Sequence, residues 1–141
     1  MAYLFKLNDS NAGWVSIPSY SISSNADFSI QFKQKVVVEN GYVRVLGRTS
    51  DFNSYMRTTS NTVYFKNAEG ATLELTFTNV AFSAGAAGHE IVFDITRTSN
   101  TITVSATDLD TEVTEEQSGT LGGSFSFDLL YKASTYTTQA E

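Results

Sequence analysis

Apolar and polar residues alternate with a period of two along most of this chain, while the spacing of an amphipathic helix is almost absent. The segment DFSIQFKQKVVV (27–38) shows the pattern most clearly, because Phe28, Ile30 and Phe32 fall on one face of an extended chain. No segment is long and helix-periodic enough to connect parallel strands, so the strands are expected to be antiparallel. The pattern predicts ten short strands, at residues 2–8, 14–23, 27–38, 42–49, 54–58, 62–67, 72–79, 89–97, 101–107 and 124–133.

Turn residues separate these segments. Asn40-Gly41 suits positive φ and predicts a tight turn, and TSN at 98–100 predicts a hairpin between the strands on either side of it. Pro18 cannot donate a hydrogen bond to a neighbouring strand, so the second predicted strand lies at an edge or is interrupted there. Strands at this spacing predict an antiparallel two-sheet sandwich or a barrel.

The length suits one domain. A chain of 141 residues can bury roughly two-thirds of its unfolded surface, and a hydrophobic fraction of 41% supplies one core. No linker rich in Pro or Gly and no shift in composition divides the chain, so residues 1–141 are predicted to form a single β-sandwich domain. Charged residues make up only 17%, and Ser, Thr and Asn take their place on a weakly charged surface.

Charge and targeting signals argue against several classes of function. Nine basic against fifteen acidic residues give a net charge of −6, and the basic residues are scattered, which argues against a nucleic-acid partner. The chain has no cysteine, so it has no disulfide, thiolate metal site or cysteine nucleophile. The start, MAYLFKLNDSNAG, does not read as a signal peptide, and no apolar run is long enough for a membrane helix. We therefore expect a protein made in the cytoplasm that does not insert into a membrane.

Four strand motifs follow one another in a familiar order. ADFSIQFKQK (26–35) is followed by VLGRTSDFNSYM (45–56), then by the strand pair GHEIVFDITRTSNTITVSATD (88–108), and then by SFSFDLLYKAS (124–134). This order resembles the laminin-G-like branch of the concanavalin A-like jelly rolls. The resemblance covers most of the chain, and it implies an all-β, antiparallel two-sheet jelly-roll sandwich of about ten short strands.

Two departures from that family's pattern accompany the resemblance. The family's usual last strand has no counterpart, because the sequence stops at STYTTQAE (134–141), so that strand is absent, supplied by a neighbour or part of a longer chain. The family's calcium-site pattern cannot be placed either. Short chains of this kind, rich in Ser, Thr and Asn and without cysteine, resemble phage structural proteins, which implies a place on the surface of a virion.

The acidic stretch TDLDTEVTEE (107–116) is the first candidate site. Asp108, Asp110 and Glu112 lie two residues apart and would share one face of a strand. The spacing resembles the carboxylate row of some glycoside hydrolases, but the first position there is a longer Glu, and the aromatic walls that raise a carboxyl pKa are missing. We expect a hairpin tip, with Asp108 and Asp110 in the turn. Glu112, Glu115 and Glu116 are expected to lie in solvent. A calcium ion held by the row is the alternative, and a catalytic role is not expected.

His89 is the only histidine, which excludes a metal site built on several histidines. It follows a loop of small residues, SAGAAG (83–88), at the head of a predicted strand. We expect its ring to hydrogen-bond a loop carbonyl, with contact to a ligand as the alternative.

Aromatic rings that are exposed beside polar groups can stack on sugar rings. Phe52, Asn53, Tyr55 and Arg57 lie in or beside one predicted loop and form the best candidate for carbohydrate binding. Alternatively, most of the aromatic residues fill the core, where such residues usually lie. The aromatic residues considered for stacking are Trp14, Tyr20, Phe52, Tyr55, Tyr64 and Tyr136.

These features predict a non-enzymatic structural or attachment module on a virion surface, of the capsid-decoration or tail-fibre type, with no required cofactor. An incomplete sandwich leaves an open strand edge, so we expect a homo-oligomer or contacts with other virion proteins. The alternative function is a lectin-like module that binds glycans through the residues around Tyr55, assisted by calcium at the acidic stretch.

Overall fold

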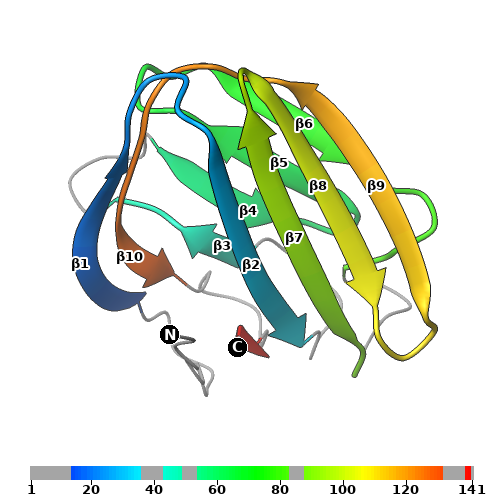
Figure 1. Ribbon diagram of the computed structural model, residues 1–141. Helices are drawn as coiled ribbons and strands as arrows, with labels where there is room; N and C mark the ends of the chain where they lie inside the picture. Colours follow the sequence, from blue (N-terminus) through cyan, green and yellow to red (C-terminus); the bar gives the residue numbers. More distant parts are fainter. Residues whose placement is uncertain (1–13, 36–42, 49–53, 83–87, 132–138, 141) are drawn as a thin grey trace.

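The computed structural model describes residues 14–35, 43–48, 54–82, 88–131 and 139–140, which form strands and loops (Figure 1). Those residues include no helix that is long and apolar enough to cross a membrane. They confirm the all-β prediction. In chain order the strands are β1 (Trp14–Ile22), β2 (Phe28–Lys35), β3 (Val43–Leu46), β4 (Tyr55–Thr58), β5 (Thr62–Lys66), β6 (Thr72–Thr76), β7 (Glu90–Thr98), β8 (Thr101–Asp108), β9 (Val113–Thr120), β10 (Phe125–Tyr131) and β11 (Gln139–Ala140).

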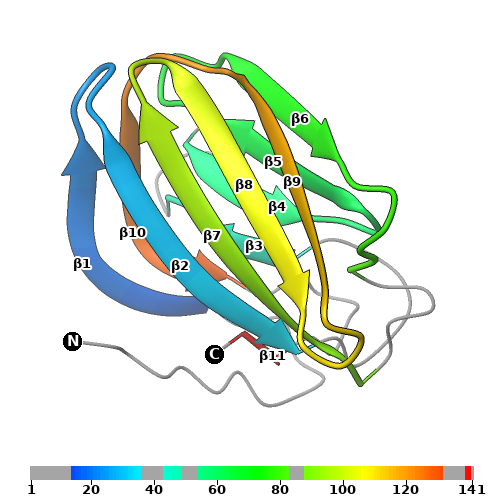
Figure 2. The same ribbon diagram turned by 45° about the vertical axis from the view of Figure 1, so that its right-hand side comes forward.

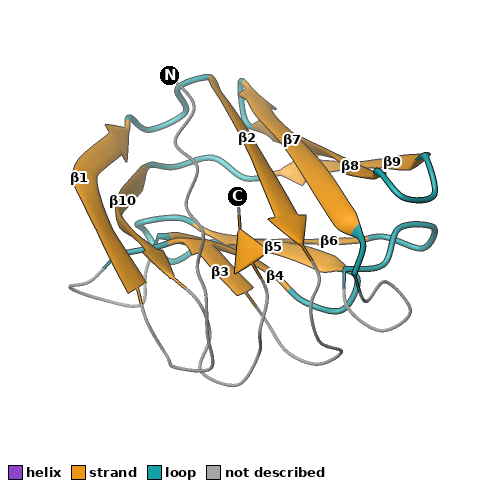
Figure 3. Cartoon of the chain, turned by 90° about the horizontal axis from the view of Figure 1, so that it is seen from below, coloured by secondary structure: helices purple, strands orange, loops and turns teal. Residues whose placement is uncertain are grey.

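The strands form two facing layers in which the pairings are antiparallel. The larger sheet has the order β11-β2-β7-β8-β9, and the smaller has the order β3-β4-β5-β6. Strands β1 and β10 pair with each other, and the N–H of Asp128 on β10 donates to the Gly47 carbonyl just after β3 at 3.0 Å, which links this pair to the smaller sheet. Figures 2 and 3 show the layers packed face to face. The predicted antiparallel β-sandwich is confirmed.

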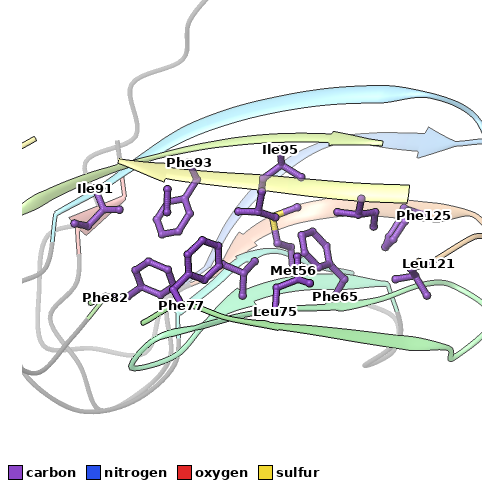
Figure 4. Packing of buried hydrophobic residues seen from close by; sticks show 14 of the residues in the cluster. Met56, Phe65, Leu75, Phe77, Phe82, Ile91, Phe93, Ile95, Leu121 and Phe125 are labelled. Carbon is purple, nitrogen blue, oxygen red and sulfur yellow. The ribbon is translucent and has the colours of Figure 1, made fainter. Parts of the chain in front are cut away.

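Side chains that point inward from both layers make one hydrophobic core (Figure 4). On β7, Ile91, Phe93 and Ile95 are fully buried and alternate with more exposed residues. The Phe93 ring stacks on Phe32 of β2, with centroids 4.7 Å apart, and meets Phe82 edge-on at 4.9 Å. Each such side chain contributes about 1.5–3 kcal/mol when it is buried. The alternation seen in the sequence is therefore what holds the two sheets together.

The interruption expected at Pro18 is present in β1. The register of β1 against β10 shifts between Ser16 and Tyr20, so Pro18 lies in an irregular stretch where no ladder N–H is needed. Among the described strands, β1 pairs with β10 alone, which makes it an edge strand. Both parts of the prediction for this proline are confirmed.

The predicted hairpin between β7 and β8 is also confirmed. Thr98 pairs with Thr101, and the turn between them contains Ser99 at a φ of 54°. The ladder then runs without a break to the pair Ile91–Asp108. Because of this register, the end of β8, with its acidic stretch, lies beside the start of β7.

Strand β9 is not predicted from the sequence, because its inward positions lack the expected apolar residues. Glu115, Gln117 and Gly119 occupy the positions that alternate toward the interior. Gly119 approaches the smaller sheet so closely that a Cβ there would lie 2.5 Å from Leu73 Cδ1 on β6. The expectation that Glu115 lies in solvent is wrong, since its exposed fraction is 9%. Burial of a carboxylate is possible here because it caps the loop that follows β6.

Some predictions fall outside the residues that the structure describes, namely the strand at 2–8 and the turn at Asn40-Gly41. Of the residues after Tyr131, the structure describes Gln139 and Ala140, which form β11 and pair with Lys35 and Gln34 of β2.

Candidate functional site

The acidic stretch lies at the turn between β8 and β9, as Figure 2 shows at the lower end of these strands. Asp108 is the last residue of β8 and is only 5% exposed. Its Oδ1 accepts hydrogen bonds from the backbone N–H groups of Asp110 and Thr111, at 2.9 and 3.3 Å. The prediction that Asp108 belongs to the turn is therefore wrong. It is a buried strand residue that caps the turn with its carboxylate.

The ring of His89 contacts a carboxylate rather than the expected loop carbonyl. Its Nδ1 lies 2.7 Å from Asp108 Oδ2, because the β7–β8 register brings the residue before β7 next to the end of β8. This hydrogen bond raises the pKa of His89. Burial acts to raise the pKa of Asp108, but hydrogen bonds from His89 and from the turn outweigh it and hold that pKa below its usual value. Both shifts favour the charged pair.

Asp110 fastens the turn to the start of β7. Its Oδ2 accepts the backbone N–H of Glu90 at 2.8 Å, and the N–H of Leu109 donates to the Glu90 carbonyl at 2.9 Å. Side-chain ligand atoms of His89, Asp108 and Asp110 all lie within 4.8 Å of one another. The sequence suggests Asp108 and Asp110 as ligands, but His89 can be added only once the β7–β8 register is known.

The structure brings together only part of the predicted calcium site, which consists of Asp108, Asp110 and Glu112. Glu112 lies outside the group formed by His89, Asp108 and Asp110, and it occupies the turn with a φ of 58°. Calcium takes six to eight oxygen ligands, as a general rule. The described side chains here offer two carboxylates and an imidazole nitrogen. These side chains alone supply fewer oxygen ligands than calcium takes, so calcium binding at this stretch stays a prediction.

The residues predicted to bind carbohydrate are described in part, since Phe52 and Asn53 lie outside the described ranges. Tyr55 and Arg57 project from β4 on the same face of the smaller sheet, and Tyr64 pairs with Arg57 from β5. The Arg57 guanidinium lies 4.5 Å from the Tyr64 ring centroid and 5.7 Å from that of Tyr55. The two tyrosine rings stack with centroids 5.7 Å apart.

This aromatic group differs from the one expected. Tyr55 is only 9% exposed, so it supports the group rather than presenting a flat face to solvent. Tyr64 is partly exposed and is the better surface for stacking. Tyr64 and Arg57 face each other across two strands, a contact that depends on the β4–β5 register and that single-sequence spacing does not show.

No protein-family model matches this sequence, and a comparison with curated proteins finds no match. The concanavalin A-like resemblance therefore rests on the strand motifs alone.

Proposed function

We propose that the chain is a non-enzymatic structural or attachment module of a virion surface, and that it assembles through the edge of β2 that faces away from β7. Strand β2 pairs with β7 along its whole length, whereas β11 covers only Gln34 and Lys35 on the other edge. Along the stretch Phe28–Phe32, no other described strand lies against that edge. This uneven coverage is the observation that supports the proposal.

A strand edge of this kind presents backbone N–H and C=O groups to a neighbour. A strand from a second copy, or from another virion protein, would satisfy these groups and extend the larger sheet. The side chains on β2 suit such a role, since Ile30 and Phe32 pack against the core while Ser29 and Gln31 remain exposed. Polar outward residues keep the edge soluble until a partner pairs with it.

The change Ser29→Lys tests this edge. A charge on an edge strand is a device by which natural sheets prevent pairing. We expect the wild-type protein to self-associate in sedimentation velocity. The dissociation constant of the variant should be about tenfold higher, which corresponds to a loss of about 1.4 kcal/mol in the free energy of association.

Thr103→Lys is the matched control. Ser29, Thr96 and Thr103 form one row across β2, β7 and β8, but β8 has a neighbour on both edges. The control should therefore assemble like the wild type. A wild-type protein that stays monomeric, or equal weakening by both changes, contradicts assembly through β2. Absence of the chain from purified virions, by mass spectrometry, contradicts its location.

Carbohydrate binding is the second candidate function, and it is favoured by the group of Tyr55, Arg57 and Tyr64. A partly exposed tyrosine ring beside a guanidinium offers one surface for a sugar ring and hydrogen-bond donors for its hydroxyl groups. Lys66 pairs with Tyr55, and Glu74 pairs with Tyr64. These charged neighbours supply further polar contacts at the border of the group.

Tyr64→Ala tests this second candidate. On a glycan array, we expect the change to weaken binding roughly tenfold, because stacking on an aromatic ring contributes about 1 kcal/mol or more. Tyr20→Ala is the control, since Tyr20 is 62% exposed but lies on β1, away from the group. Calcium and chelator should give the same result. If no glycan binds, or if both changes weaken binding equally, the carbohydrate site is refuted.

A further inference from the structure

We propose that His89, Asp108 and Asp110 bind a divalent transition-metal ion such as zinc. The three side chains come from the residue before β7, the end of β8 and the following turn. Their ligand atoms lie within 4.8 Å of one another, although the residues are up to 21 positions apart in the sequence. This inference goes beyond the proposed assembly function and does not depend on it.

The donor types decide which ion fits. Imidazole nitrogen combined with carboxylate oxygen suits zinc and cobalt, whereas calcium and magnesium prefer oxygen ligands alone. Metal–ligand bonds of about 2.0 Å in a tetrahedral site place ligand atoms about 3.3 Å apart. His89 Nδ1 and Asp108 Oδ2 lie 2.7 Å apart, so a small opening of this pair admits the ion. Three protein ligands then leave the fourth position to water.

The carboxylates are already held in place by their other contacts. Backbone N–H groups of Asp110 and Thr111 donate to Asp108 Oδ1, which keeps Oδ2 directed at His89. The N–H of Glu90 donates to Asp110 Oδ2. Ligating carboxylates in metal sites are typically held by such outer hydrogen bonds. The fixed geometry lowers the conformational cost of binding an ion.

Charge balance also favours a divalent ion here. The carboxylates of Asp108 and Asp110 bring two negative charges to the group. A divalent ion bound by the His89 imidazole and these two carboxylates brings two positive charges, so the ion and its ligands sum to zero. The His89 side chain is 27% exposed, so the ion can enter from solvent.

The test uses the untagged chain of residues 1–141, because His89 is then the only imidazole in the sample. Zinc should shift the single set of His89 ring signals in NMR spectra and raise the thermal midpoint relative to chelator. Cobalt should give the visible absorption of a coordinated ion. Calcium should produce neither the ring shift nor the rise in midpoint.

Variants assign the ligands. His89→Gln and Asp110→Asn should each weaken zinc binding by more than about tenfold, since even outer-shell partners of metal sites have effects of that size. Glu112→Gln is the matched control, because Glu112 belongs to the same turn but lies outside the ligand group. The proposal is overturned if zinc leaves the His89 ring signals unshifted and cobalt gives no visible absorption. Full zinc binding by His89→Gln, or equal loss in Glu112→Gln, overturns it as well.

Discussion

Replacing Arg97 by methionine is expected to lower the free energy of unfolding by about 3–5 kcal/mol. Arg97 is only 1% exposed and continues the core-facing series of Phe93 and Ile95 on β7. Its guanidinium lies over the rings of Phe28 and Phe125, with centroids at 5.0 and 5.4 Å. Methionine fills much of the same volume, so the loss should come mainly from hydrogen bonds. Urea unfolding followed by circular dichroism measures it.

The guanidinium of Arg97 joins two loops to β7. Nε donates to the Ala26 carbonyl at 2.8 Å, Nη1 to the Gly123 carbonyl at 2.8 Å, and Nη2 to the Ser23 carbonyl at 3.2 Å. Without the guanidinium each of the three carbonyls loses one hydrogen bond, although the Ser23 and Gly123 carbonyls keep the backbone N–H groups of Ala26 and Asn25 as donors. A hydrogen bond to a charged group contributes about 1.5–3 kcal/mol. The planar fork of arginine is what allows one side chain to satisfy all three.

Two companion variants make the result interpretable. The free energy of unfolding of Arg97→Lys should lie between those of Arg97→Met and the wild type, because an ammonium group cannot reach three carbonyls at once. Thr96→Met places the same side chain at the exposed neighbouring position and should change stability by no more than about 0.5 kcal/mol. If Arg97→Met costs less than about 1 kcal/mol, the guanidinium does not hold the loops in the way proposed.

The role of Arg97 shows where sequence patterns stop being informative. The alternation in HEIVFDITR places Arg97 on the same face as Ile95, so its inward direction follows from the pattern. Its hydrogen-bond partners do not, because Ser23 and Gly123 are distant in the chain and come together only when both sheets have formed. Local periodicity predicts a strand and its faces, but not contacts between distant loops.

The group of His89, Asp108 and Asp110 can be predicted from the sequence in part. The TSN turn predicts the β7–β8 hairpin, and its tight Thr98–Thr101 closure fixes each later pair up to Ile91–Asp108. Extending the same register beyond Ile91–Asp108 places His89 beside the acidic stretch. The hairpin could therefore have revealed the contact of His89 with Asp108 from sequence alone, had its register been followed to the end. Glu112 does not belong to the group because β8 ends at Asp108, and the spacing of the acidic residues does not show where the strand ends.

Strand β9 does not follow from the sequence pattern, for a different reason. Its inner face is polar because it covers the edge of the smaller sheet and the loop after β6, rather than the centre of the core. Acidic residues there resemble a solvated run, which is the usual meaning of such a pattern. What makes Glu115 an inward residue is the row of backbone donors that faces it, and those donors belong to residues about 36 positions earlier.

Glu115 accepts hydrogen bonds from three consecutive backbone N–H groups. Thr78 N lies 3.0 Å from both carboxylate oxygens, Asn79 N lies 2.6 Å from Oε2, and Val80 N lies 3.2 Å from Oε2. Gln117 Nε2 donates as well, at 3.1 Å. Burial acts to raise the pKa of Glu115, but these hydrogen bonds outweigh it and lower the pKa to about 2. The carboxylate thus fastens the loop after β6 to β9.

Glu115→Gln is expected to lower the free energy of unfolding at neutral pH by roughly 2–3 kcal/mol, because a neutral amide accepts fewer and weaker hydrogen bonds from the loop. The folded-state pKa of about 2 lies below the ordinary value of 4.5. The stabilisation from this carboxylate is therefore complete above pH 4.5 and is lost as pH falls toward 2. The difference between wild type and variant should narrow over the same range. Urea unfolding at a series of pH values measures it.

Glu116→Gln is the control at the next position, since Glu116 is exposed on the outer face of β9 and should tolerate the change within about 0.5 kcal/mol. Equal effects of the two changes, or a Glu115→Gln deficit that persists unchanged at pH 2, would refute the role assigned to the buried carboxylate. The result also bears on assembly. An inward-pointing charge on an edge strand is a natural means of preventing edge pairing. If Glu115 anchors β9 in this way, the inward charge disfavours pairing at β9, and the proposed assembly would use the stretch Phe28–Phe32 of β2 that β11 does not cover.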